Sequence, residues 1–153
     1  MFITAVLIVI SILFVMAWLS KSGHSYGLID NSLAPCPDKP NCVCSEYDQD
    51  TQHYISPLPI STDALPIALS AIQSSVENLG GQVTNKSDHY IAATFTSSFF
   101  GFVDDVEFRI DTTQQLVHIR SSARIGHSDF GVNQKRAIEL KASLHQHFAQ
   151  YYI

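Results

Sequence analysis

The sequence contains few basic residues, and they are scattered along the chain. Nine lysines and arginines stand against fourteen aspartates and glutamates, so the 153-residue chain has a formal net charge of −5. A protein that binds nucleic acid needs a cluster of basic side chains to neutralise phosphates. The composition therefore argues against nucleic acid as a partner.

Recognisable catalytic motifs are also missing. The chain has no nucleophile elbow, no phosphate-binding loop and no pair of histidines at a metal-binding spacing. We therefore assign no catalytic residue, no metal site and no cofactor from the sequence. Its length allows one domain with a short appendage.

Charged residues are missing from the segment Phe2–Ser20, which is almost wholly apolar. As a helix, this segment would be about 28 Å long, close to the thickness of the hydrocarbon core of a bilayer. It is either a membrane helix or a signal sequence. The chain begins without a basic side chain, and the residues from Ala17 to Ser20 form a poor cleavage site. We therefore expect residues 1–21 to be an uncleaved, single-pass anchor in the cytoplasmic (inner) membrane.

Residues 22–56 are rich in small and polar residues and have no sustained periodicity, which predicts a tether followed by an irregular loop. All three cysteines lie in this segment. Cys36 and Cys42 are close enough to form a disulfide, which would leave Cys44 unpaired and would fit a periplasmic domain. A metal site completed by a nearby histidine is the alternative, but this cysteine spacing matches no usual zinc motif. Nothing in the sequence supplies a base for a catalytic Cys44.

Residues 57–153 predict an α+β domain composed of a helix, a four-stranded antiparallel meander and a C-terminal helix. The first helix is expected to begin at Thr62 or Asp63 and to end before Gly80. The four strands are expected at residues 82–86, 90–97, 103–110 and 116–123. The last helix is expected to turn five apolar side chains toward the sheet: Val132, Ile138, Leu140, Leu144 and Phe148.

The two middle segments, residues 103–110 and 116–123, alternate between apolar and polar side chains. They are separated by a short polar turn, which indicates an antiparallel hairpin. We expect a register in which Ile110 lies opposite Val117. One face of this hairpin is then mostly apolar and the other mostly ionic.

The ionic face of the hairpin forms a ladder of opposite charges in this register. Glu107 faces Arg120, and Arg109 faces His118. One interpretation is a solvated sheet face whose surface pairs contribute little to stability. The other is a polar site. Asp104 favours the second interpretation, because it falls on the apolar face, where an unpaired carboxylate is costly.

Two connecting segments border this hairpin. Phe99, Phe100 and Phe102 precede it, and we expect them to close the core, with the wall of an apolar ligand pocket as the alternative. A second loop follows the hairpin and leads into the last helix. Ser128 or Asp129 can cap that helix.

The loop before the last helix has two interpretations. With Arg124, Asn133 and Arg136 nearby, its free backbone amides could bind an anion. Alternatively, Asp129 pairs with Arg124 or Arg136 and simply locks the loop. The sequence does not decide between these two roles.

Three long motifs stand out: C-P-D-K-P-N-C-V at residues 36–43, F-G-F-V-D-D-V-E-F at 100–108 and R-S-S-A-R-I-G-H-S-D-F-G-V-N-Q-K-R at 120–136. Together they resemble a family of bacterial and plastid proteins classed as a domain of unknown function. The resemblance covers nearly all of the chain after the tether and implies an uncharacterised membrane-anchored or exported protein. It implies no catalytic role for any residue. The chain departs from the family pattern at Cys44, where serine is common, and at Gln134, where a basic residue is common.

These observations support two hypotheses of different classes. The first is a non-enzymatic binding or accessory module for a small ligand or anion, a lipid or a partner protein. The second is a hydrolase-type enzyme that uses Asp104, Asp105 or Glu107 with His118 or His127 as acid and base. The candidate polar site for either comprises Asp104, Asp105, Glu107, Arg120, Arg124, Ser128, Asp129, Asn133 and Arg136.

Overall fold

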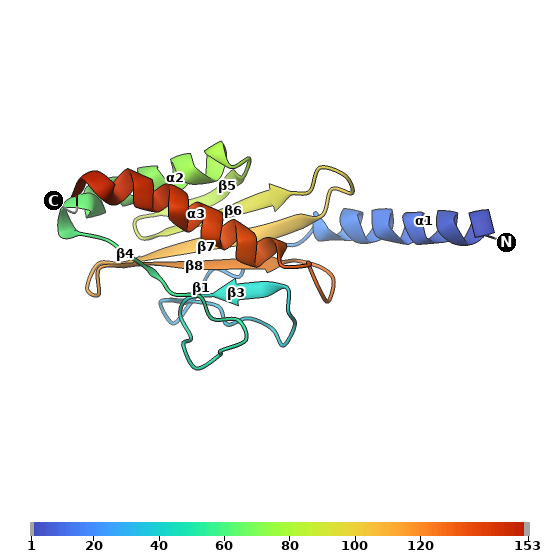
Figure 1. Cartoon of the computed structure of the whole chain (residues 1–153), viewed down its shortest axis with the longest axis horizontal. Coiled ribbons are helices and arrows are strands. Elements are labelled where there is room, and N and C mark those ends of the chain that lie inside the picture. Colours follow the sequence, from blue (N-terminus) through green and yellow to red (C-terminus); the bar gives the residue numbers. More distant parts are fainter. Residues whose placement is uncertain (1, 152–153) are drawn as a thin grey trace.

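The structure is a computed structural model that describes residues 2–151. A long N-terminal helix, α1 (Phe2–Ser20), projects from one end of an α+β domain (Figure 1). The predicted segments 1–21 and 57–153 also include Met1 and residues 152–153, which lie outside the described residues.

The domain is built on a six-stranded antiparallel sheet. Four strands form a meander in chain order, as predicted: β5 (Gln82–Ser87), β6 (Tyr90–Thr96), β7 (Val103–Asp111) and β8 (Leu116–Ala123). The predicted total of four strands is wrong, because two earlier segments pair with β8: β3 (Cys42–Cys44) and β4 (Leu58–Pro59). Strands of this length are too short to show a periodic pattern in the sequence.

The pairing of β7 with β8 has the predicted register. Ile110 lies opposite Val117, and Glu107 lies opposite Arg120. Because side chains alternate along a strand, this register fixes which residues of the two strands share a face of the sheet. The apolar set and the ionic set therefore lie on opposite faces.

Two helices cover the apolar face: α2 (Ala68–Asn78), which continues a 3₁₀ turn, η1 (Thr62–Ile67), and α3 (Val132–Phe148), which ends in a second 3₁₀ turn, η2 (Ala149–Tyr151). The core between the helices and the sheet includes Ile72, Val76, Val106, Phe108, Ile119, Leu140, Leu144 and Phe148. The prediction that Val132 and Ile138 face the sheet is wrong, because both are exposed. The buried stripe of α3 instead runs at helical spacing through Asn133, Ala137, Leu140, Leu144 and Phe148.

The segment predicted to be a tether and loop crosses the ionic face of the sheet. It forms a small hairpin, β1 (Leu28–Ile29) with β2 (Ser32–Leu33), before it reaches β3. Leu33 packs with Cys44, Tyr90 and Ala92 in a second, smaller core on this face. The interpretation of the ionic face as solvated is therefore wrong, because the tether covers it.

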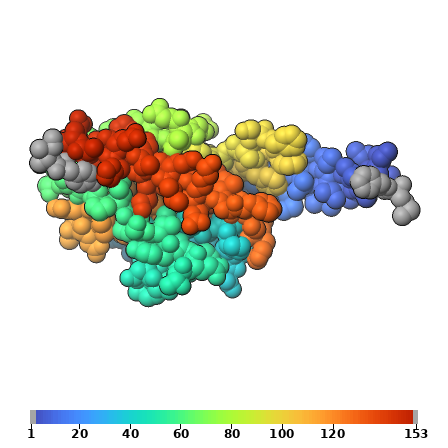
Figure 2. All heavy atoms as spheres, viewed as in Figure 1, coloured from blue at the N-terminus to red at the C-terminus, as the bar shows by residue number. Residues whose placement is uncertain are grey.

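The loop between β6 and β7 lies against α1, and the space-filling view shows the two in contact (Figure 2). The ring centroids of Phe100 and Phe14 are 5.9 Å apart. Phe99 is 83% exposed, so the prediction that it closes the core is wrong. Phe100 contacts the N-terminal helix instead, and Phe99 and Phe102 pack on Phe100.

Candidate functional site

The sheet divides the candidate polar residues into two groups on opposite faces. The face crossed by the tether carries Asp105, Glu107, Arg120 and Arg124. The helical face carries Asp104, which pairs with Arg136 of α3. Arg136 also binds Asn133, and Asn133 binds Asp129 in the loop before α3. Ser128 is exposed in that loop. The predicted single site is thus two separate clusters.

Glu107 and Arg120 form a buried ion pair at the centre of the tether-covered face. Both are fully buried, at 0% and 1% exposed, and Arg120 Nη1 donates to Glu107 Oε2 at 3.1 Å. The other oxygen of Glu107 accepts from the Tyr90 hydroxyl at 2.6 Å and from the backbone N–H of Gly27 at 2.8 Å. Removal from water by burial also raises the pKa of Tyr90, which keeps its hydroxyl a donor. Glu107 is therefore well satisfied.

Arg120 is not satisfied. Its Nε and Nη2 atoms are buried and have no hydrogen-bond partner among the residues that the structure describes. Buried polar atoms are nearly always paired, so an exception of this kind needs an explanation. The ring of Tyr26 lies over the guanidinium, with the Arg120 Cζ atom 4.9 Å from the ring centroid. Tyr26 itself is 68% exposed, so a surface side chain lies against the buried guanidinium.

Two other arginines on this face use the same guanidinium edge on a carboxylate. Arg124 donates from Nε and Nη2 to the two oxygens of Asp105, at 2.8 and 2.7 Å. Arg109 donates from Nε and Nη2 to the two oxygens of Glu46, at 2.7 and 3.0 Å. Both pairs are bidentate, the geometry in which arginine binds carboxylates and phosphates most specifically. In Arg120 the corresponding Nε and Nη2 atoms bind no carboxylate of residues 2–151.

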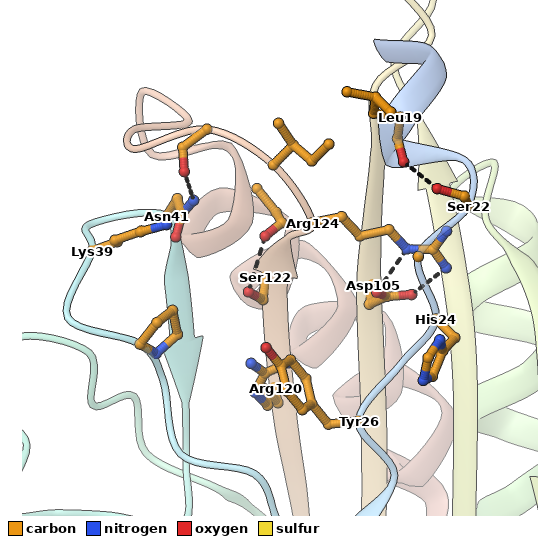
Figure 3. A pocket seen from close by; sticks show the side chains of 15 residues that line it. Leu19, Ser22, His24, Tyr26, Lys39, Asn41, Asp105, Arg120, Ser122 and Arg124 are labelled. Carbon is orange, nitrogen blue, oxygen red and sulfur yellow. Dashed lines mark hydrogen bonds and ion pairs between the residues drawn. The ribbon is translucent and has the colours of Figure 1, made fainter. Parts of the chain in front are cut away.

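Arg120 and Arg124 line a cleft of about 510 Å³ between the tether and the end of β8 (Figure 3). Its wall includes Leu19 from the last turn of α1 and the residue pair His24 and Tyr26 from the tether. The charged side chains that line it are Lys39, Asp105, Arg120 and Arg124. Asp105 pairs with Arg124, and Glu107 pairs with Arg120, so the excess positive charge of the cleft comes from Lys39.

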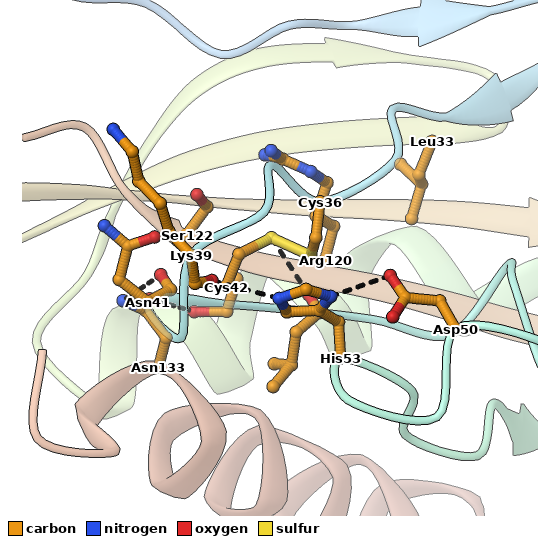
Figure 4. Close-up of a disulfide and its surroundings, with 12 residues drawn as sticks. Leu33, Cys36, Lys39, Asn41, Cys42, Asp50, His53, Arg120, Ser122 and Asn133 are labelled. Carbon is orange, nitrogen blue, oxygen red and sulfur yellow. Dashed lines mark hydrogen bonds and ion pairs between the residues drawn. A yellow bond between two sulfur atoms is a disulfide. The ribbon is translucent and has the colours of Figure 1, made fainter. Parts of the chain in front are cut away.

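The disulfide loop supplies the opposite wall of the cleft (Figure 4). The predicted bond between Cys36 and Cys42 is present. Lys39 and Asn41 lie inside the loop that it closes, and both line the cleft. Asn41 Nδ2 donates to the backbone oxygen of Gly126 at 2.9 Å, whereas Asn41 Oδ1 is buried and has no partner among the described residues. The disulfide therefore holds part of the cleft in place.

Sequence analysis did not find the partner of Arg109 and His118. Both contact Glu46, which lies in the irregular segment after β3 and is 7% exposed. His118 Nδ1 is 3.4 Å from Glu46 Oε2, and burial lowers the pKa of this histidine. Asp111 also binds Arg109, at 3.1 Å. Glu46 stands in no periodic pattern, so the sequence held no signal for this contact.

The cluster on the helical face locks the loop before α3, but not through the predicted pairs. Asp129 accepts from the backbone N–H of Asn133 at 2.7 Å and from that of Gly131 at 3.1 Å, at the start of α3. The amides predicted to bind an anion are therefore already occupied. The N-cap residue of α3 is Gly131, so the prediction that Ser128 or Asp129 caps this helix is wrong. Arg136 pairs with Asp104 at 3.0 Å. Burial raises the pKa of Asp104, and the charge of Arg136 offsets part of that effect.

Cys44 is the unpaired cysteine, as predicted, and it is buried. Burial raises the pKa of its thiol to about 11, so it is protonated and unreactive near neutral pH. No group of three or more His, Cys, Asp or Glu side chains within residues 2–151 is arranged to hold a metal ion. His53 binds Asp50 and the backbone oxygen of Lys39, so it braces the disulfide loop.

Within the described residues, α1 is the one helix long and apolar enough to cross a membrane, although a signal sequence has the same character. No curated protein matches the chain in a sequence comparison. A family model does match, over residues 32–144, a range that includes β3 to β8, the disulfide loop and most of α3. The match confirms the resemblance found in the sequence, and the chain belongs to the family described as "Protein of unknown function (DUF1499)".

Proposed function

We propose that the domain is a non-enzymatic binding module that takes an anionic group, a phosphate or a carboxylate, in the cleft of Figure 3. The observation that carries this proposal is the edge of Arg120, whose Nε and Nη2 are buried and unpartnered among the described residues. These two N–H groups are parallel and match two oxygens of one anion. Arg124 and Arg109 hold Asp105 and Glu46 by this edge, and the ligand would occupy the equivalent position on Arg120.

The charge of the cleft supports an anion rather than a neutral or cationic ligand. Lys39 and Arg124 stand beside Arg120, and Asp105 is the one carboxylate that lines the cleft within the described residues. Both oxygens of Asp105 are engaged by Arg124. A bound anion would therefore gain charge-assisted hydrogen bonds without facing an unpaired carboxylate.

The position of the cleft suggests where the ligand comes from. Leu19, in the last turn of α1, lines the cleft. With α1 in a bilayer, the cleft would stand at the level of the lipid headgroups. The disulfide supports a periplasmic location for the domain, because such bonds persist outside the reducing cytosol. The anion is then either a lipid headgroup phosphate or a small soluble anion that shares its chemistry.

The hydrolase alternative would need a carboxylate free to move a proton. Asp104, Asp105 and Glu107 are each engaged by an arginine. No described contact joins them to either histidine that the alternative would use. This engagement of the carboxylates favours binding over catalysis.

Thermal melts of the full chain in a zwitterionic detergent test the proposal, because a ligand that binds the folded state raises the melting temperature. Inorganic phosphate is the probe for a free anion, and phosphatidylglycerol, compared with phosphatidylcholine, is the probe for a lipid headgroup. At a hundredfold excess over the dissociation constant, binding adds about 2.7 kcal/mol, which raises the melting temperature by roughly 5–11 °C. We expect at least one probe to produce this rise.

Two variants attribute the rise to the cleft. Lys39→Glu reverses the charge of an exposed side chain at the cleft and should abolish the rise in melting temperature. Lys86→Glu is the control, because it makes the same change in net charge on the helical side of the sheet, where Lys86 contacts Gln73 of α2. This variant should keep the rise in melting temperature. Failure of both probes to stabilise the wild type, or an equal rise in the two variants, would refute anion binding in the cleft.

A further inference from the structure

The loop between β6 and β7 is uncharged and rich in phenylalanine. Residues 96–102 read T-S-S-F-F-G-F and contain no charged side chain. Phe99 is 83% exposed. The rings of Phe99 and Phe100 lie 4.7 Å apart, and those of Phe100 and Phe102 lie 6.1 Å apart. A cluster of aromatic rings at the tip of an exposed loop is costly in water.

This loop contacts α1 well before the helix ends. The ring of Phe100 packs edge-to-face on that of Phe14, with centroids 5.9 Å apart. Phe14 lies six residues before Ser20, which corresponds to about 9 Å along a helix. A second contact, from the backbone N–H of Val103 to Ser20 Oγ at 3.1 Å, fixes the start of β7 to the end of α1.

The contact with Phe14 determines how deep the loop lies in the membrane. If the whole apolar length of α1 lies in the hydrocarbon core, Phe14 lies about 9 Å below the surface of that core. Phe100 touches Phe14, so the tip of the loop must reach the same depth. Lys21, just after α1, lies near Gly101 at the neck of the loop, where its ammonium group can stay in the headgroup region.

The backbone of the loop is suited to this position. Irregular backbone is excluded from lipid when its polar groups are unpaired. Here the N–H of Ser97 donates to the oxygen of Phe102 at 2.8 Å, and the N–H of Gly101 donates to the oxygen of Ser97 at 3.0 Å. The N–H of Phe102 donates to Ser97 Oγ at 2.9 Å. The loop thus satisfies part of its own backbone without water.

We infer that the β6–β7 loop is a second membrane contact, a wedge that inserts Phe99 and Phe100 among the lipid chains beside α1. The partner is the acyl-chain region of the bilayer that α1 crosses. The wedge fixes the domain against the membrane instead of leaving it free on a tether. This inference rests on α1 being a membrane helix, and it does not depend on what the cleft binds.

Fluorescence quenching of the full chain in liposomes tests the wedge. A polarity-sensitive dye is attached to a single introduced cysteine in the Cys44→Ser background, which leaves Cys36 and Cys42 in their disulfide. Phe99→Cys places the dye at the tip of the loop. Asp88→Cys places it in the exposed turn between β5 and β6, at the opposite end of the meander. Ile8→Cys places it on an exposed position of α1.

We expect lipids that carry a nitroxide on the acyl chain to quench most of the fluorescence at positions 8 and 99, and none at position 88. Aqueous iodide should give the reverse pattern. Quenching of position 99 by iodide but not by the lipids, with position 8 quenched by the lipids, would overturn the wedge while leaving α1 in the membrane. Loss of lipid quenching at position 8 as well would overturn both the membrane helix and the wedge.

Discussion

Replacement of Arg124 by alanine should destabilise the domain strongly. The substitution removes both hydrogen bonds to Asp105 and the bond from Arg124 Nη1 to the backbone oxygen of Ser20, at 3.1 Å. It leaves Asp105, whose side chain is 6% exposed, buried with an uncompensated charge. Removal of one partner of a buried ion pair costs about 3–5 kcal/mol. For a chain of this size, that corresponds to a melting temperature lower by roughly 6–20 °C.

Circular dichroism melts of the full chain in detergent measure this loss. Lys135→Ala is the matched control. Lys135 and its partner Glu139 are both exposed, and such a pair contributes only about 0.3–0.5 kcal/mol to the stability of the folded protein. The double variant Asp105→Asn with Arg124→Ala should recover part of the loss, since it removes the buried charge. A melting temperature for Arg124→Ala equal to that of the control would refute the claim that this pair braces the domain.

Three further predictions follow from buried groups. Asp104→Ala should lower the melting temperature by several degrees, because it leaves Arg136 without its carboxylate. The loss should be smaller than for Arg124→Ala, because the substitution also removes the cost of burying the Asp104 carboxylate, the burial that raises its pKa. An unchanged melting temperature would contradict this prediction. A thiol reagent under non-reducing conditions should label no cysteine in the folded protein and only Cys44 after unfolding, since the pKa of its buried thiol is about 11; three labelled thiols would disprove the disulfide. Burial lowers the pKa of His118, so near pH 6.5 the unfolded chain binds a proton that the folded protein excludes. The stability of the domain should therefore fall as the pH drops through 6.5. The same pH dependence in His118→Asn would show that another group causes it.

The meander, its register and the disulfide could be predicted because each leaves a local pattern. Strict alternation over β7 and β8 determined which residues share a face, and the short loop between Cys36 and Cys42 indicated the bond. The very short strands β3 and β4 could not be predicted in this way. Their pairing with β8 depends on the tertiary structure and not on any repeat in their own sequence.

Of the side chains that line the cleft, the sequence pattern singled out Asp105, Arg120 and Arg124 but not Tyr26, Lys39 or Asn41. Asp104 and Asp105 are adjacent in the sequence and therefore point to opposite faces of the sheet, so they belong to different clusters. Tyr26 and Glu46 contact Arg120 and Arg109 of the ionic face from the irregular tether. Neither periodicity nor residue spacing in the tether predicts these contacts. Burial of the charge ladder depends on this cover, and the sequence suggested a free tether instead.

Native mass spectrometry of the full chain, extracted gently from its own membrane, tests anion binding in the cleft most directly. We expect the wild type to carry a phosphate- or carboxylate-bearing species that disappears on denaturation, and Lys39→Glu to carry none. Arg120→Lys, which keeps the charge but loses the paired N–H edge, should also lose the species if its melt shows that it folds. Detection of the wild type without any bound species, also after addition of phosphate and phosphatidylglycerol, would contradict the proposed function.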